Sequence, residues 1–568
     1  MNRISALVFF FILSFSSVLF AQNLETGRTL FQNGDYERAA RVFDQLDSPE
    51  ANLYSGKSYF SLGELLKAKH YLNQASINAT DKNVKLESQY TLALVYFQLG
   101  DFYSSLESLY SLKQNNSGSI FESKAETLYN QILNYVSISQ LYEIFNRSNN
   151  DDIRFDLLSA SVGRFEYSTV RTVLNKYKNT VVNFNQNRLY QIEAALSDSL
   201  LYRQKYTQKK YPTAPNGILY KIGVALPHFD FESDEYEISQ HLYFGIQLAI
   251  EEYNASHSDK KVFLKYRDTN PSVNSPAEAL NKLVWDDDVD IVIGPLFSEV
   301  AQTFSRLSEE YEVPVLTPLA NSDSLSIYNN FLFQLNPTFS VRGIKMAQYA
   351  VNTLKLDTLA VLAEKNSLGE ASAYAFLNEA QRLGAVVQHF FVEDFESEGY
   401  SILQYTEKFS KSDTLNPSPG LKAIYAPFTG AVSPSLIQSL ITDLEASKSD
   451  YILLGSEEWK NTELSGRNLP GTSIYYSQSF NTSDTNSIEA EHFKSAFRLR
   501  FQIEANQFAY IGYDAASLIL SILDEVENPD YLKEGLRKLN YYKGLSTKVS
   551  FSGNHVNQNV EVNSITKF

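Results

Sequence analysis

The sequence predicts two fold classes in one chain: an N-terminal array of helical hairpins, followed by a two-lobed α/β module. Before residue 203, apolar residues recur at the three- and four-residue spacing of amphipathic helices. After residue 218, short β-branched runs alternate with helical stretches, which is typical of α/β domains. At about 150 residues per domain, the length predicts roughly three to four such units.

The composition excludes several classes of protein. The 568 residues include no cysteine, so the chain has no disulfide, thiolate metal site, cysteine nucleophile or lipidated N-terminal cysteine. The 49 Lys and Arg residues stand against 66 Asp and Glu, which gives a formal charge of -17. Because a nucleic acid binds a basic surface, this acidic excess predicts that nucleic acid is not a partner.

Residues 1–21 have the pattern of a secretory signal peptide. Arg3 precedes an apolar run from Ala6 to Leu13, and the small residue Ala21 closes the segment. A membrane anchor is the alternative, but this run is shorter than the ~20 residues of a spanning helix. We therefore expect cleavage after Ala21, export to the periplasm, and a mature chain without a membrane anchor.

Residues 24–202 are predicted to form helical hairpins. Three segments share a spacing in which glycine is followed five residues on by a small residue and nine on by a large apolar one. They are Gly34/Ala39/Phe43, Gly63/Ala68/Leu72 and Gly100/Ser105/Leu109, each with a small residue seven before its glycine, at Gly27, Gly56 and Ala93. Small residues let two antiparallel helices approach, and large ones fill the groove between them. The pattern over about residues 24–112 resembles the tetratricopeptide repeat, and a generic antiparallel helical bundle is the alternative.

The helical pattern continues from Ser117 to Gln204 without a clear repeat, which predicts further hairpins. Helical stacks of this kind bind peptides or partner proteins on their concave face. Residues 203–218 are basic, contain two prolines and lack periodicity, so they are interpreted as a linker.

Residues 219–568 contain two series of predicted strands. The first series begins at Lys221, Val262, Val289, Val313 and Phe331, and the second at Thr358, Ala385, Ala423 and Tyr451. Apolar strands alternating with helices indicate a parallel sheet covered on both faces. Two series predict two lobes, one of about residues 219–337 with 480–545, the other of about 338–479 with 546–568. The helices Glu489–Asn506 and Ala509–Val526 are expected to return to the first lobe, and KVSFSG from Lys548 to complete the second.

The string from Ile291 to Leu325 resembles the first lobe of type I periplasmic binding proteins, in particular the leucine/isoleucine/valine-binding group. Further matches are Phe244-Gly245, LLGSEEW from Leu453 and AYIGYDAASLI from Ala509. The resemblance spans about residues 220 to 568. It implies two lobes that close over a small, amino-acid-like molecule by a hinge motion.

Candidate binding residues follow the predicted strands, because ligands of such sheets lie off the carboxyl ends of the strands. In the first lobe these groups are Ser298, Thr317 to Asn321, and His228-Phe229-Asp230. The resemblance implies that Ser298, Leu319 and Asn321 hold an amino-acid ligand, that Phe428 is an aromatic contact, and that Glu457 pairs with the ligand ammonium. The predicted ligand-binding residues are therefore Ser298, Thr317, Leu319, Asn321, Phe428 and Glu457.

Each candidate also has a purely structural interpretation. Ser298 is also a suitable N-cap residue for a helix, and Asn321 is a residue type that is common in turns. The alternative for Phe428 is a place in the hydrophobic core, and for Glu457 it is exposure to water. The chain also has Leu368-Gly369 where relatives often carry Tyr-Gly, and an acidic, aromatic loop from His228. Both features disfavour an ordinary amino acid as the ligand.

An enzyme is not expected. The sequence lacks a Gly-x-Ser-x-Gly elbow, a His-Glu-x-x-His motif, a Walker loop and a Gly-x-Gly-x-x-Gly after a strand, and we predict no cofactor. The acidic run Asp286-Asp287-Asp288 with Asp290 is interpreted as a solvated loop, so no metal site is predicted.

Two functions remain open. One is an exported solute-binding protein whose helical repeats dock a partner in the cell envelope. The alternative is a non-catalytic envelope interaction protein, because the layout is similar to outer-membrane activators of peptidoglycan synthases. Those relatives are lipoproteins, and this chain has no cysteine to carry that anchor.

Overall fold

The computed structural model divides the chain into two compact units. The first comprises Met1–Tyr220, His257–Phe263 and Val526–Asp530, and the second comprises Lys221–Ser256, Leu264–Glu525 and Tyr531–Phe568. The structure describes residues 23–115, 119–165, 167–178, 186–199, 201–202, 218–229, 231–233, 235–257, 260–270, 275–397, 399–410, 420–448, 450–462, 472–480 and 487–565. The predicted leader, and the predicted linker up to residue 217, lie outside them. Within these ranges no helix is both long and apolar enough to cross a membrane.

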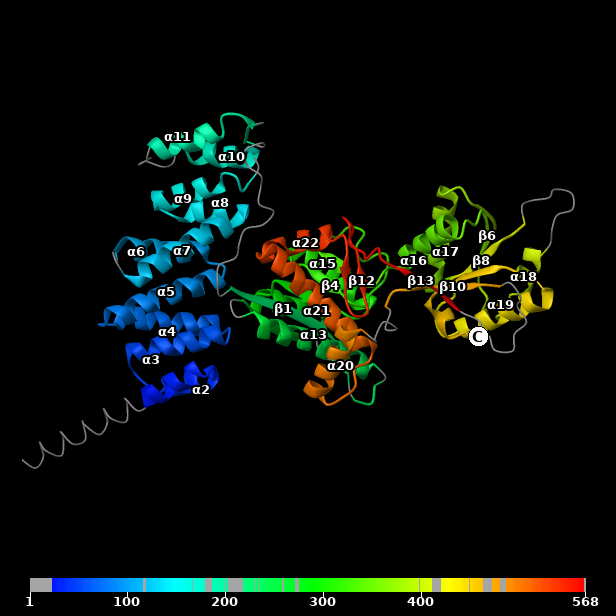
Figure 1. The fold of residues 1–568 in the computed structure, drawn as a ribbon, viewed down its shortest axis with the longest axis horizontal. Helices are drawn as coiled ribbons and strands as arrows, with labels where there is room; N and C mark the ends of the chain where they lie inside the picture. Colours follow the sequence, from blue (N-terminus) through cyan, green and yellow to red (C-terminus); the bar gives the residue numbers. More distant parts are fainter. Residues whose placement is uncertain are drawn as a thin grey trace, which may run out of the picture. The chain divides into compact units, whose positions relative to one another are not determined.

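The first unit is an array of helices, coloured blue to cyan in Figure 1. A helix over residues 23–32 is followed by α2 (Tyr36–Phe43), α3 (Pro49–Ser61), α4 (Leu65–Asn78), α5 (Lys82–Gln98), α6 (Phe102–Asn115), α7 (Ile120–Tyr135), α8 (Ile138–Arg147), α9 (Asp151–Ser161), α10 (Tyr167–Tyr177) and α11 (Gln186–Ala195). From α2 to α7 each helix packs on the next one along the chain. The helical hairpins predicted from the sequence are therefore confirmed.

Small residues bring the paired helices together. A Cβ atom added to Gly27 would lie 2.6 Å from Cε1 of Phe43, and one added to Gly56 would lie 2.5 Å from Cγ of Leu72. Phe43 and Leu72 are fully buried. The glycines thus leave the space that the large side chains of the facing helix occupy, which is the physical basis of the sequence spacing.

Glycines also make the turns between paired helices. Gly34, Gly63 and Gly100 have φ angles of 79°, 73° and 73°. Side chains rarely adopt this left-handed backbone conformation, so glycine is favoured at these turns.

The first lobe of the second unit is built on a five-stranded sheet in the order β2-β1-β3-β4-β5. Its strands are β1 (Ile218–Leu226), β2 (Lys260–Asp268), β3 (Ile291–Ile293), β4 (Val315–Thr317) and β5 (Leu332–Gln334). β1, β3, β4 and β5 pair in parallel, and β3, β4 and β5 are fully buried. This agrees with the predicted apolar runs, because parallel strands are covered on both faces.

Helices α13 (Tyr236–Ser256), α14 (Pro276–Asn281), α15 (Ser298–Tyr311), α20 (Ile488–Phe501), α21 (Gln507–Val526) and α22 (Leu532–Lys538) complete this lobe. Two glycines let α13 and α21 approach each other closely. A Cβ on Gly245 would lie 2.0 Å from the carbonyl oxygen of Ala509, and one on Gly512 would lie 2.0 Å from that of Leu242. Through these contacts α21 packs on α13 of the first lobe.

The second lobe has a six-stranded sheet in the order β13-β10-β9-β8-β6-β7. Its strands are β6 (Thr358–Glu364), β7 (Val386–Glu393), β8 (Ala423–Ala426), β9 (Ile452–Gly455), β10 (Ile474–Gln478) and β13 (Glu561–Ile565). Helices α16 (Phe339–Gln348) and α17 (Leu368–Arg382) share one core with the sheet, and α18 (Leu403–Ser410) and α19 (Ser433–Ser447) share another. Alternate residues of β6 enter the two cores, so helices cover both faces of this sheet.

The structure departs from the sequence expectation near the C-terminus. The KVSFSG segment does not join the second sheet, because β12 (Lys548–Val549) pairs with β11 (Tyr542–Lys543) in a separate hairpin. The strand that completes the second sheet is β13, which pairs antiparallel with β10.

The packing of α3 on α4 gives a first prediction. Gly56→Ala should destabilise the first unit by about 1–3 kcal/mol, because its Cβ overlaps Leu72. Leu72→Ala alone should cost about 2–5 kcal/mol through the cavity it leaves. The double variant should be more stable than the sum of the two effects, because the alanine at 56 fills part of that cavity. Urea unfolding followed by far-UV circular dichroism measures all three, and strictly additive losses would contradict this account.

Candidate functional site

Ser298 joins two strand ends in the first lobe. It is the first residue of α15, which follows β3, and its Oγ accepts hydrogen bonds from the backbone N–H groups of Asn321 at 3.2 Å and Ser322 at 3.3 Å. Asn321 lies in the loop after β4. Because β3 and β4 are parallel neighbours, their carboxyl ends lie side by side, and the structure brings Ser298 and Asn321 together there. The Ser298 hydroxyl keeps its own proton for donation.

Amide side chains donate hydrogen bonds to the backbone carbonyl groups of the same loop. Asn336 Nδ2 donates to the carbonyl oxygen of Leu319 at 2.9 Å, and Gln334 Nε2 donates to that of Ser322 at 3.0 Å. Thr317 is fully buried, and its Oγ1 lies 3.4 Å from the carbonyl oxygen of Phe333. The loop is therefore fixed by amide side chains, while Thr317 belongs to the interior of the sheet.

In the second lobe, the loops after β8 and β9 are joined. Ser456 Oγ donates a hydrogen bond to the carbonyl oxygen of Phe428, and Trp459 Nε1 donates to that of Ala426 at 2.9 Å. Phe428 is fully buried and packs edge-to-face on Phe395. The Phe428 ring is thus core in this structure, and Glu457, which follows Ser456, is held beside it.

Leu368 lies where relatives often carry tyrosine. It is the first residue of α17 and is 61% exposed. The following residue must be glycine, because a Cβ on Gly369 would lie 1.9 Å from the carbonyl oxygen of Pro427. Gly369 N–H donates to Thr429 Oγ1 at 3.1 Å. An exposed apolar side chain is therefore anchored next to the end of β8.

Arg342 is a buried positive charge beside Glu457 that was not predicted from the sequence. This residue of α16 is buried, its Nη2 donates to Asn336 Oδ1 at 2.8 Å, and its Nε donates to the carbonyl oxygen of Pro337 at 3.3 Å. Its Nη1 lies 3.8 Å from Glu457 Oε2. Arg342 is followed by Gly343, which marks a close helix contact, but nothing in the sequence reveals its distant partners.

Burial sets the charge state of this pair. Burial raises the pKa of Glu457, although Arg342 acts in the opposite direction. Burial also lowers the pKa of the Arg342 guanidinium, and Glu457 partly offsets that effect. Each charge is therefore favoured by the other and disfavoured by the loss of water.

The six predicted residues fall into two groups. Ser298, Leu319 and Asn321 share the strand ends of the first lobe, and Phe428 and Glu457 share those of the second. None of the six lines the cavity of about 630 Å³ in the helical array or the cavity of about 290 Å³ at the end of β1. Arg342, Asn336 and Gln334 were not predicted.

The acidic run near Asp286 pairs with basic residues. Asp288 lies 3.3 Å from Lys221 Nζ and Asp287 lies 2.5 Å from Arg267 Nη2. Among the residues that the structure describes, no group of three or more His, Cys, Asp or Glu could hold a metal ion.

Two lobes, each with loops gathered at the carboxyl ends of parallel strands, define a two-lobed binding module. The sequence model described as "Periplasmic binding protein" matches residues 237–566, and the chain therefore belongs to this family.

The chain is 29% identical over 150 residues to a Leu/Ile/Val-binding protein of Citrobacter freundii, covering 26% of this chain and 40% of that protein. It is 26% identical over 234 residues to the Leu/Ile/Val-binding protein homolog 3 of Brucella melitensis, covering 40% of this chain and 60% of that protein. Both matches thus span less than two thirds of the relative. Among solved structures, the ABC transporter substrate-binding protein of Desulfitobacterium hafniense in complex with Leu has a TM-score of 0.45 at 18% identity, covering 61% of this chain and 98% of that one.

The raised pKa of Glu457 predicts a pH effect on stability. Because the folded chain holds the Glu457 proton more tightly than the unfolded chain does, binding of this proton stabilises the fold. The contribution is complete below the ordinary pKa of a glutamate and is lost as the pH rises through the raised pKa. As the pH rises from the ordinary to the raised pKa, the free energy of unfolding of the natural chain should therefore fall relative to that of Glu457→Gln. Both tryptophans, Trp285 and Trp459, lie in the second unit, so tryptophan fluorescence during urea unfolding reports on it.

The matched control is Glu458→Gln, at the neighbouring exposed carboxyl. This variant keeps Glu457 and should therefore retain the loss of stability with rising pH, reduced only by the part of the raised pKa that comes from the Glu458 charge. A stability difference between the natural chain and Glu457→Gln that stays flat or grows with pH would contradict the assignment.

Proposed function

We propose that the protein is exported to the periplasm and captures a small molecule between the two lobes of its second unit, without catalysing a reaction. Membership of the periplasmic binding protein family supports this proposal. The names of the curated relatives favour an amino-acid-like solute. The observation that carries it is Glu457, a half-buried carboxyl after β9 whose ionisation burial disfavours.

The proposed ligand combines an ammonium group with an apolar body. An ammonium beside Glu457 would favour the ionised carboxylate by opposite charge. Arg342 already contacts this carboxylate, so the ligand shares it rather than being its sole counter-ion. The exposed Leu368 offers an apolar contact near the end of β8. In the first lobe, Ser298 Oγ and the backbone near Asn321 are proposed to bind the polar end of the same ligand.

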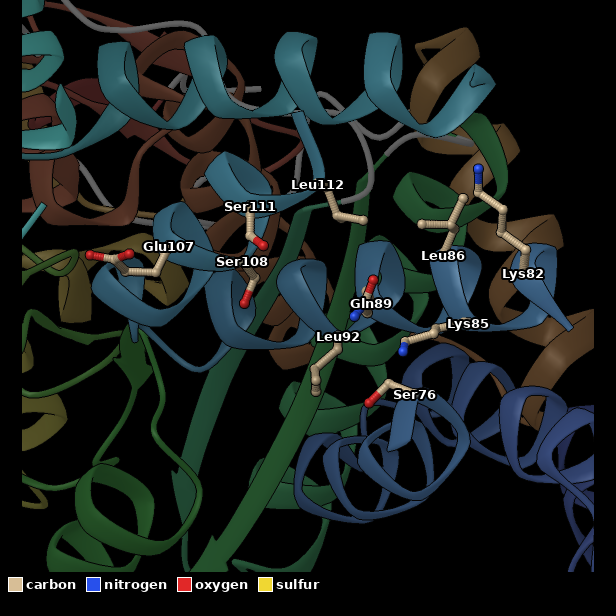
Figure 2. Close-up of a pocket in the computed structure, with 10 residues that line it drawn as sticks. All are labelled: Ser76, Lys82, Lys85, Leu86, Gln89, Leu92, Glu107, Ser108, Ser111 and Leu112. Carbon is tan, nitrogen blue, oxygen red and sulfur yellow. The ribbon is translucent and has the colours of Figure 1, made fainter. Parts of the chain in front are cut away.

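We further propose that the helical array docks a partner in the cell envelope. A groove of about 630 Å³ lies between α4, α5 and α6, lined by Ser76, Lys82, Lys85, Leu86, Gln89, Leu92, Glu107, Ser108, Ser111 and Leu112. Figure 2 shows Lys82 and Lys85 at one end and Glu107 at the other. Over the described chain, neither lysine has an ion-pair partner.

The groove favours a segment with acidic residues. Lys82 and Lys85 place two positive charges at one end of the groove, and these charges attract a negatively charged segment. Leu86, Leu92 and Leu112 are buried in its lining, and the side chains of Ser108 and Gln89 offer hydrogen-bonding groups to an extended backbone. This groove supports the partner-docking function, including the alternative in which the chain is an envelope scaffold.

Solute capture predicts a ligand-dependent rise in melting temperature of the second unit. A ligand at a hundredfold excess over its Kd stabilises a protein by about 2.7 kcal/mol. We expect a rise with leucine, isoleucine or valine, read by tryptophan fluorescence, and its loss in Glu457→Gln but not in Glu458→Gln. If none of a wide panel of amino acids and amines shifts the natural chain, capture of this solute class is wrong. If Glu457→Gln responds like the natural chain, only the assigned role of Glu457 fails.

Partner docking predicts a charge-dependent complex. The full chain should co-purify with an envelope protein from cells, and bind a synthetic peptide rich in Asp and Glu, more weakly as salt increases. The double variant Lys82→Glu, Lys85→Glu should lose both, whereas Lys67→Glu, Lys69→Glu on α4 outside the groove should keep them. Equal recovery and equal peptide affinity for both double variants would contradict the groove as the docking site.

A further inference from the structure

Gln334 is a fully buried carboxamide side chain at the end of β5, beside the loop that follows β4. Its backbone pairs with Thr317, the last residue of β4. A carboxamide costs free energy at such an interior position unless its polar groups have partners, and an apolar side chain carries no such cost. The hydrogen bonds of Gln334 must therefore account for its presence.

Both ends of this side chain bind the loop after β4. Nε2 donates hydrogen bonds to the carbonyl oxygen of Ala320 at 3.3 Å and to that of Ser322 at 3.0 Å. Oε1 accepts a hydrogen bond from Ser326 Oγ at 3.0 Å. These partners fix the orientation of the carboxamide, because its NH2 group alone can donate to two carbonyl oxygens. Gln334 thus holds the loop at three points.

Asn321 lies between the two carbonyl groups that Gln334 holds. The backbone N–H groups of Asn321 and Ser322 donate to Ser298 Oγ. The peptide group that joins Ala320 to Asn321 is therefore fixed at its C=O and at its N–H. Among the residues that the structure describes, neither the side chain nor the carbonyl oxygen of Asn321 has a hydrogen-bond partner. Asn321 is half-buried, so these two groups are available to a solute.

The backbone of Gln334 is itself fixed by the last segment that passes between the lobes. Its N–H donates to the carbonyl oxygen of His555 at 2.8 Å, and its carbonyl oxygen accepts from the N–H of Asn557 at 3.0 Å. Val556 forms a parallel bridge with Gln334. The end of β5 cannot shift without breaking these bonds, so the carboxamide is held in place relative to the loop.

We propose that Gln334 is a positioning residue of the solute site, which holds the peptide groups on both sides of Asn321 so that the carboxamide and carbonyl group of Asn321 meet the solute in one fixed orientation. A loop that is ordered before the solute arrives loses less entropy on binding, which raises the affinity. The proposal rests on solute capture between the lobes. Gln334 does not contact the solute and acts through Asn321.

The first test needs no solute. Gln334→Met removes the hydrogen bonds to the loop and keeps a long, flexible side chain in the interior. Hydrogen exchange of the full chain, followed by mass spectrometry, should then be about tenfold faster in peptides that contain the amide groups of Asn321 and Ser322. Unchanged exchange in these peptides would overturn the proposal.

Asn329→Leu is the matched control, at the other end of the same strand. Asn329 is also a buried carboxamide that fixes a loop, and its Nδ2 donates to Ser308 Oγ at 3.1 Å. Its replacement should lower the melting temperature as Gln334→Met does, but should leave exchange at Asn321 unchanged. Equally fast exchange at Asn321 in both variants would show general loosening of the lobe and would overturn the positioning role.

The second test is calorimetric titration of the full chain with L-leucine. Gln334→Met should weaken binding about tenfold, which corresponds to about 1.4 kcal/mol, whereas Asn329→Leu should leave the affinity unchanged. Asn321→Ala should weaken binding in the natural chain but have little further effect in the Gln334→Met background, because both changes remove the same contact. Losses that multiply in the double variant would refute action through Asn321.

Ser326→Ala is the milder variant, which decides the matter if Gln334→Met does not fold. It frees Oε1 of Gln334, so exchange at Asn321 should rise by a smaller factor, and no rise would count against the proposal. Failure of L-leucine to bind the natural chain would refute capture of this solute. The exchange measurements decide in either case whether Gln334 orders the loop.

Discussion

The buried guanidinium of Arg342 holds together the parts of the binding unit that meet where the chain first passes between the lobes. It donates to the side chain of Asn336 and to the carbonyl group of Pro337 in the crossing segment, and it faces Glu457 in the second lobe. Asn336 in turn donates to the carbonyl group of Leu319 in the first lobe. One chain of polar contacts therefore runs from a strand-end loop of one lobe to that of the other. Removing any member would leave a buried polar group without its partner, which costs more than the contact itself contributes.

The last segment that passes between the lobes is also fixed by hydrogen bonds to buried polar side chains. The buried carboxyl of Asp514 on α21 accepts hydrogen bonds from the backbone N–H groups of residues 545–547. Asn557 Nδ2 then donates to the carbonyl group of Leu335, beside the first crossing. These hydrogen bonds fix the crossing segments to the first lobe. The strand β13 (Glu561–Ile565) is the part of the chain that then joins the second sheet.

How far the sequence predicts this structure depends on burial. The strands Ile291–Ile293 and Thr358–Glu364 are predicted because parallel strands covered on both faces are continuously apolar. The edge strand Glu561–Ile565 was missed because it is half-exposed and rich in polar residues, so its pattern resembles a loop. The meeting of Ser298 with the loop after β4 follows from parallel topology alone. The role of Arg342 does not, because a single arginine in an amphipathic helix indicates a surface position until its distant partners are known.

β1 and β3 are parallel neighbours in the first sheet, so the segment after β1 lies beside the start of α15, which follows β3. The ring of Phe229, after β1, packs edge-to-face on that of Phe297, with ring centroids 6.3 Å apart. Phe297 is the N-cap residue of α15 and directly precedes Ser298. The N-terminus of α15, where Ser298 accepts hydrogen bonds from the loop after β4, is therefore also held by an aromatic contact from the loop after β1.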